Sequence, residues 1–127
     1  MNYKLGKSHV AKDERGVLMA NDFEALPFIP KRVIFVRFSE ELRPRGDHAY
    51  KYEQVIQCLK GTIKIHLKNG RDTDYEELKP GDWIWIEPMT WVIMSGQCEC
   101  TMAIIYSSEK YNADDYEKNW NKYLTRT

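Results

Sequence analysis

The sequence predicts an all-β fold, an antiparallel sandwich or barrel with a short helix at its C-terminal end. Three observations lead to this class. Short runs of β-branched and aromatic residues recur at the roughly 8–12-residue spacing that is typical of such folds. Turn-forming Gly, Pro, Asn and Asp residues separate these runs. Helical periodicity is visible only beyond residue 114.

The expected strands follow one another along the chain. The run 33–38 comes after two prolines, and the run 54–59 ends at a Lys-Gly turn. The run 62–67 alternates strictly between apolar and polar residues and leads into Asn69-Gly70, the strongest short hairpin signal. The later runs are 83–86, 91–94 and 101–106, and the acidic stretch 72–77 is expected to form a solvated edge. These runs predict a single domain spanning 1–127.

The C-terminal segment has the pattern of a short helix. Asp114-Asp115 could cap it, with Tyr116, Trp120 and either Tyr123 or Leu124 on one stripe. The chain of 127 residues is long enough to bury a core.

The composition narrows the classes of partner. Lys and Arg together number 19, as do Asp and Glu, so the formal net charge is zero. Binders of nucleic acid or of anionic membranes normally carry a cationic excess, so we expect neither partner. No run approaches the ~18 apolar residues of a membrane span, which favours a soluble, cytoplasmic protein. We expect Cys58, Cys98 and Cys100 to be reduced, with the last two as neighbours on one strand face.

The most informative stretch lies around His48. The pattern His48-Ala-Tyr50, followed by Gln54 and then Gly61, resembles the cupin signature of His-x-His, Glu and Gly. The resemblance implies a cupin-type antiparallel jelly-roll barrel. Tyr50 and Gln54 replace two metal ligands, and Val92 stands where the last one would be. Because one imidazole, a phenol and an amide make a poor divalent-metal site, we expect no metal.

The residues that remain suit acid–base chemistry. A strand from 48 to 58 would put His48, Tyr50 and Gln54 on one face. Neutral histidine is the side chain best suited to accept a proton near neutral pH, and a tyrosine can donate to a developing oxyanion. The basic side chains of Arg43, Arg45 and Lys51 lie nearby in the sequence and could hold phosphates. The alternative is a structural barrel histidine beside a solvated basic loop.

The same stretch resembles a known enzyme family. Arg45-Gly-Asp-His-Ala-Tyr-Lys51, with Gln54 following, is similar to the Arg-Gly-x-His-Ala-His-Lys…Gln signature of dTDP-4-oxo-6-deoxyglucose 3,4-ketoisomerases, which are metal-free, WxcM-like cupins. Weaker matches occur in the same order over nearly the whole chain, in the segments 14–18, 27–33, 58–61, 88–91 and 114–116.

The resemblance implies an isomerase that moves a ketone between C4 and C3 of a dTDP-linked 4-keto-6-deoxyhexose. Such enzymes need no cofactor, form jelly-roll homodimers with exchanged N-terminal strands, and serve deoxysugar biosynthesis for lipopolysaccharide, other surface glycans or antibiotics. His48 matches the first histidine and is the expected base, and Tyr50 would replace the second histidine as the acid. The expected substrate-binding residues are Arg15, Arg32, Arg45, Lys51, Gln54 and Trp91.

Two other functions remain open. An epimerase acting beside the ketone of the same kind of substrate would use a similar pair of groups. A non-catalytic cupin that binds a sugar nucleotide would explain the changed histidine positions.

Overall fold

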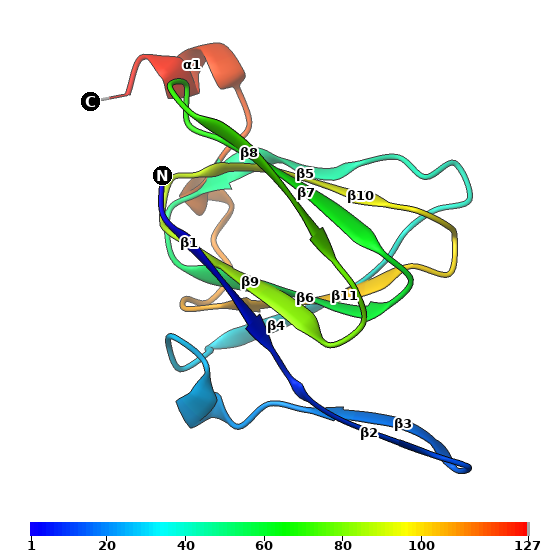
Figure 1. Cartoon of the computed structure of the whole chain (residues 1–127). Helices are drawn as coiled ribbons and strands as arrows, with labels where there is room; N and C mark the ends of the chain where they lie inside the picture. Colours follow the sequence, from blue (N-terminus) through cyan, green and yellow to red (C-terminus); the bar gives the residue numbers. More distant parts are fainter. Residues whose placement is uncertain (127) are drawn as a thin grey trace.

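The computed structural model describes residues 1–126 and contains two five-stranded antiparallel sheets that face each other (Figure 1). The first sheet has the order β1-β9-β6-β11-β4, and its strands are Tyr3–Lys7, Asp82–Ile86, Gln54–Lys60, Met102–Ser107 and Arg32–Arg37. The second has the order β12-β5-β10-β7-β8, and its strands are Tyr116–Glu117, Arg45–Tyr50, Trp91–Gly96, Ile63–Lys68 and Thr73–Leu78. Strands β2 (His9–Asp13) and β3 (Gly16–Ala20) form a separate hairpin.

This architecture confirms the prediction of an all-β, antiparallel fold of the jelly-roll kind. Strand pairing keeps the two large sheets separate in the described part of the chain, so they form a sandwich and not a closed barrel. The β2–β3 hairpin extends away from the sandwich (Figure 1). Short 3-10 turns lie at Phe23–Ala25 and Ala113–Asp115.

The alternating pattern of the sequence places the core between the two sheets. In β7, Ile63, Ile65 and Leu67 are fully buried, while Lys64 between them is exposed. Residues of the first sheet meet them from the other side, among them Ile56, Ile84, Ile86 and Ala103. Asn69-Gly70 lies in the turn between β7 and β8, as predicted, and β8 is a mostly exposed edge strand.

The prediction of a continuous strand from 48 to 58 is wrong. The chain turns at residues 51–53, so β5 ends at Tyr50 and β6 begins at Gln54 in the opposite sheet. His48 and Gln54 therefore face each other across the sandwich instead of following one another along a single strand.

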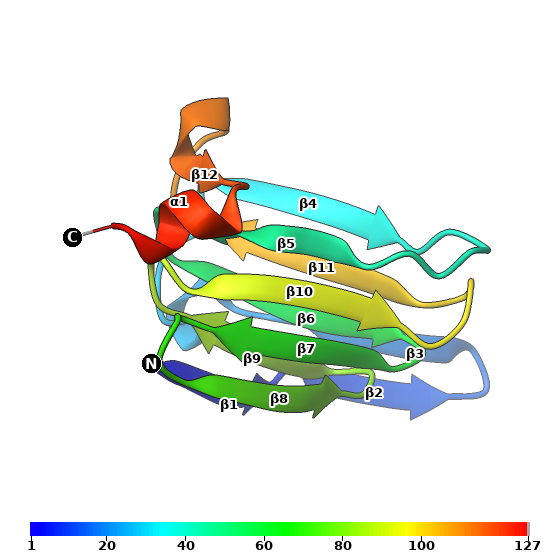
Figure 2. The ribbon, with the colours of Figure 1, turned by 90° about the horizontal axis from the view of Figure 1, so that it is seen from above.

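The C-terminal helix is shorter than predicted and has a different cap. Helix α1 covers Trp120–Leu124, and the Asn119 side chain accepts a hydrogen bond from the Lys122 amide at 3.0 Å. Tyr116, expected on the helix, belongs instead to strand β12. Figure 2 shows β12 and α1 at the same end of the sandwich. In residues 1–126 no helix has the length and apolar character needed to cross a bilayer.

A second apolar cluster lies beneath α1, on the outer face of the second sheet. It joins Trp91 and Ala49 to Tyr123 of the helix, with Trp120 packed beside them. The Trp91 ring lies 5.1 Å from that of Trp120 and 5.3 Å from that of Tyr123, both edge-on. These contacts hold α1 on the sheet.

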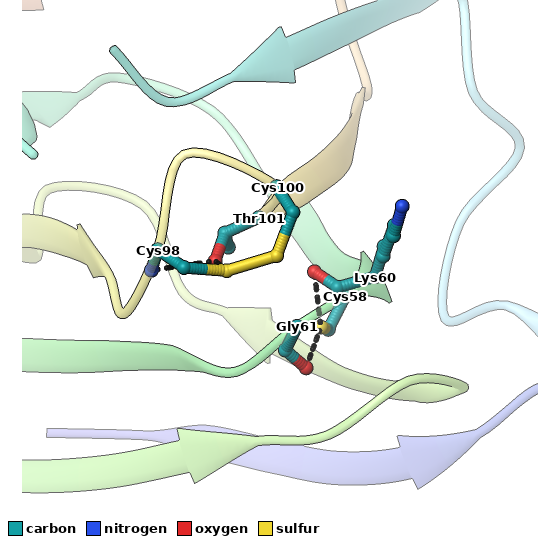
Figure 3. The surroundings of a disulfide bond; sticks show 6 residues. All are labelled: Cys58, Lys60, Gly61, Cys98, Cys100 and Thr101. Atoms are coloured by element: carbon teal, nitrogen blue, oxygen red, sulfur yellow. Dashed lines mark hydrogen bonds between the residues drawn. A yellow bond between two sulfur atoms is a disulfide. The ribbon is translucent and has the colours of Figure 1, made fainter. Parts of the chain in front are cut away.

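The prediction that all three cysteines are reduced is wrong for Cys98 and Cys100, which were also expected on one strand. Cys98 and Cys100 form a disulfide in the loop between β10 and β11 (Figure 3). The two cysteines lie in a loop that turns, so their sulfur atoms can bond. The prediction had placed them as unbonded neighbours on one face of a straight strand. Cys58 is free and buried, and burial raises the pKa of its thiol to about 11.

Candidate active site

A cavity of about 430 Å³ opens between the two sheets, at the end where β12 lies. Strands β4, β6 and β11 supply one wall, β5 and β10 supply the other, and the segment 111–118 lines the mouth. The floor is apolar and includes Ile34, Ile56, Val92 and Ile105. The polar lining residues are Arg32, Arg45, His48, Gln54, Ser107, Tyr111, Tyr116 and Lys118.

A bulge in β5 precedes His48. His48 pairs with Val92 of β10, but the next pair joins Gly46 to Ile93, so Asp47 is an extra residue. Gly46 and Asp47 both have positive φ, 82° and 56°, a region that glycine and aspartate tolerate better than most residues. The Asp47 carboxylate accepts a hydrogen bond from the Trp91 indole at 2.9 Å. The bulge thus directs Asp47 to the outer cluster and leaves His48 facing the cavity.

The surroundings of His48 favour its neutral form. Burial lowers the pKa of His48 below its usual value, and the nearby Lys118 ammonium lowers it further, while Asp47 acts in the opposite direction. A histidine with a lowered pKa is unprotonated at neutral pH and can accept a proton.

The charged side chains that line the cavity are all basic. Arg32, Arg45 and Lys118 line it, and no aspartate or glutamate is among the lining residues. A cavity with three cations and no carboxylate suits an anionic ligand such as a phosphate ester. In the stretch from residue 1 to 126, no three His, Cys, Asp or Glu side chains cluster so as to hold a metal ion.

Four of the residues predicted for the site come together at this cavity: His48, Arg32, Arg45 and Gln54. Lys51 lies outside it, on a neighbouring surface hollow that shares Tyr111 with the cavity.

Two other predicted binding residues lie elsewhere. Trp91 faces the opposite side of its sheet, because Val92 lines the cavity and successive strand residues point to opposite faces. Arg15 is at the turn of the β2–β3 hairpin, where its guanidinium pairs with Asp13 at 2.6 Å.

Tyr50 shares a face with His48, as predicted, but it is only 2% exposed and does not line the cavity. Its ring stacks on that of Tyr116 with centroids 4.8 Å apart. Its hydroxyl is buried and has no hydrogen-bond partner among residues 1–126. Burial is the main reason that the pKa of Tyr50 is raised, while the nearby Ser107 side chain acts in the opposite direction.

The structure adds four polar residues that sequence reasoning did not assign to the site: Ser107, Tyr111, Tyr116 and Lys118. Tyr116 and Lys118 reach the cavity because β12 pairs with β5, with Tyr116 opposite Tyr50. The short similarity around Asp114-Asp115-Tyr116 was the available signal, but helical periodicity assigned Tyr116 to a different element.

A jelly-roll sandwich with an imidazole, phenols and three cationic side chains around one cavity has the composition of a site for an anionic ligand in a cupin-like fold. Comparisons with known proteins give the family. The family model described as "FdtA: WxcM-like, C-terminal" matches residues 1–127. A TDP-4-oxo-6-deoxy-alpha-D-glucose-3,4-oxoisomerase from Aneurinibacillus thermoaerophilus is 31% identical in an alignment 121 residues long that covers 90% of this chain and 86% of the relative.

Solved structures agree with this assignment. QdtA, a sugar 3,4-ketoisomerase from Thermoanaerobacterium thermosaccharolyticum crystallised with TDP, is 31% identical, with a TM-score of 0.87 over 97% of this chain and 92% of its own. A 3,4-ketoisomerase from Helicobacter canadensis is 28% identical, with a TM-score of 0.87 over 98% of this chain and 96% of its own. The chain belongs to the WxcM-like sugar 3,4-ketoisomerase family.

Proposed function

We propose that this protein is an isomerase that moves the ketone between C4 and C3 of a dTDP-linked 4-keto-6-deoxyhexose, with His48 as the base. The observation that carries the proposal is the single cavity in which His48 faces three cationic side chains without a carboxylate. Family membership supports the substrate class, because its relatives include enzymes named for this reaction.

The reaction needs only proton transfers. The C4 ketone acidifies the C3 proton, which His48 removes, and the electron pair forms a C3–C4 double bond. The carbonyl oxygen at C4 accepts a proton, which gives an enediol. Loss of the proton from the C3 hydroxyl and protonation at C4 then leave the ketone at C3. No electron or atom is gained overall, so the step calls for a positioned base and acid and for no redox partner.

The polar residues that line the cavity are suited to different parts of the substrate. Arg45 is suited to the pyrophosphate, since guanidinium groups bind phosphate oxygens bidentately. Gln54 offers an amide to the sugar hydroxyl groups from the wall opposite His48. A phenol beside His48 would serve as the acid. Tyr50 is the phenol that the sequence motif names.

The decisive assay follows dTDP-4-keto-6-deoxyglucose by proton NMR in heavy water. Isomerisation predicts loss of the C3 proton signal and growth of the 3-keto product. His48→Asn should reduce both by at least ~10²-fold, the usual contribution of a general base, while TDP still binds. Deuterium at an inverted C3 or C5 would support an epimerase instead. Binding without exchange by the wild-type protein would support a non-catalytic sugar-nucleotide binder.

We further propose that the enzyme is a homodimer in which the β2–β3 hairpin packs on the partner. The two strands pair only with each other within residues 1–126. Val10, Val17 and Leu18 of the hairpin are 44%, 55% and 57% exposed. On β4, Phe35 is 70% exposed. Full burial of such a side chain is favourable by roughly 1.5–3 kcal/mol, so these partly exposed side chains would gain about half of that each or somewhat more against a second subunit.

An exchanged hairpin would also bring Arg15 close to a substrate site. At the tip of an exchanged hairpin, Arg15 would lie on the partner subunit, where the family resemblance assigns an arginine to the substrate. Light scattering after gel filtration should give twice the chain mass for the wild type and a smaller mass for Leu18→Asp. A monomeric wild type would contradict the exchange.

A further inference from the structure

The cavity contains a phenol in direct contact with the imidazole. The ring of Tyr116 meets that of His48 edge-on, with centroids 4.9 Å apart and planes at 67°. Both residues line the cavity. A substrate carbonyl next to the carbon that His48 deprotonates would therefore lie within the reach of Tyr116.

The backbone fixes the position of Tyr116. Strand β12 pairs with β5 so that Tyr116 stands opposite Tyr50. Just before it, the Asn112 side chain accepts a hydrogen bond from the Asp114 amide at 3.0 Å, and the Lys51 amide donates to the Asp115 carbonyl at 2.9 Å. The phenol is thus carried by ordered backbone, as a proton donor in a defined place requires.

Arg32 determines which way the phenol can donate. Its guanidinium donates to the Tyr116 oxygen at 2.8 Å. Because a guanidinium has donors but no acceptor, the proton of Tyr116 cannot point at Arg32 and is available to the cavity. The same cation would stabilise the negative charge left on the oxygen after the proton departs.

The other phenol is in a worse position for this role. Tyr50 does not line the cavity, and its hydroxyl is buried without a hydrogen bond in the described part of the chain. Its ring supports that of Tyr116 by stacking.

We propose that Tyr116 is the catalytic acid of this site, an assignment that rests on the proposed ketoisomerase function. As His48 takes the C3 proton, the Tyr116 hydroxyl gives its proton to the C4 carbonyl oxygen. The phenolate, held by Arg32, then takes the proton of the C3 hydroxyl as the new C3 carbonyl forms. The proton that His48 holds returns to C4, so both side chains end in their starting states.

The test compares three Tyr→Phe variants, each of which keeps its ring. Tyr116→Phe should lower kcat in the NMR assay by ~10²–10⁴-fold, the usual contribution of a positioned acid. Calorimetry should give a TDP dissociation constant within ~3-fold of the wild type, because the ring contacts persist. Tyr50→Phe should lose far less activity than Tyr116→Phe. Tyr75→Phe, on the exposed face of β8, is the control and should match the wild type.

The outcomes separate the two proposals. Full activity in Tyr116→Phe, with an active wild type, overturns the role of Tyr116 and leaves the isomerase function in place. Loss of activity in Tyr50→Phe with retention in Tyr116→Phe assigns the acid to Tyr50 and also overturns the proposal. A wild type that neither exchanges nor converts the substrate overturns the function and the role together. An unchanged kcat with a raised KM and an equally weakened TDP affinity would reduce Tyr116 to a binding residue and overturn the proposal.

Discussion

Gly46→Ala should damage both the stability and the activity of this protein. Gly46 has φ of 82°, and a methyl group there would lie 2.8 Å from the Val92 carbonyl oxygen in the neighbouring strand. The left-handed conformation costs an alanine about 1–2 kcal/mol. The overlap is with backbone, so β5 must move from β10 by roughly 0.5 Å to regain van der Waals distance.

The backbone strain and the overlap with β10 together set the expected losses of stability and of activity. Strain together with overpacking amounts to about 2–4 kcal/mol of lost stability. With an unfolding entropy of ~2.1 cal/mol/K per residue, a chain of 127 residues should then melt about 8–15 °C lower. His48 lies two positions further along β5. Since a misplacement of ~1 Å can cost 10²-fold in rate, a shift half as large should lower kcat by roughly 10-fold.

Thermal unfolding and the NMR assay measure the two effects, and Gly70→Ala is the matched control. Gly70 also has positive φ, 92°, but its added methyl group would meet only the Leu124 side chain, which can move. The control should melt about 4–8 °C lower, with wild-type kcat. If Gly46→Ala melted no lower than Gly70→Ala and kept full activity, the bulge would not position His48.

Three further predictions follow from the site and the core. Because the pKa of His48 is lowered, mainly by burial, the acidic limb of the pH profile of kcat/KM should lie below pH 6.5. The unfolded chain binds this proton at a higher pH than the folded protein does, so the free energy of unfolding should fall as pH drops from 6.5 toward the lowered pKa. Lys118→Met should move the limb to higher pH, and an unmoved limb would contradict the assigned cause. Tyr50→Phe removes an unpaired buried hydroxyl and should raise the melting temperature by about 4 °C, for ~1 kcal/mol, in calorimetry; a lower value would mean that the hydroxyl has a partner. The Cys98–Cys100 disulfide closes a very short loop, so replacing both cysteines by serine should cost only about 1–2 kcal/mol in urea unfolding, and loss of folding would show a larger role.

The sequence by itself determined the class of fold and the centre of the site. Strict alternation in the run 62–67 and the Asn69-Gly70 turn predicted a buried strand and its hairpin, because side-chain direction along a strand is a local property. The motif around His48 likewise placed the imidazole, Arg45 and Gln54 at one site. These residues are close in the chain, so a single turn suffices to bring them together.

Only the tertiary structure decided which aromatic groups face the substrate cavity. Trp91 and Tyr50 were expected there, yet Trp91 lies on the outer face of its sheet and Tyr50 is buried away from the cavity. Tyr116 took the position next to His48 through the pairing of β12 with β5. That pairing joins segments far apart in the chain, and its register depends on the whole sandwich, so no local pattern of residues encodes it.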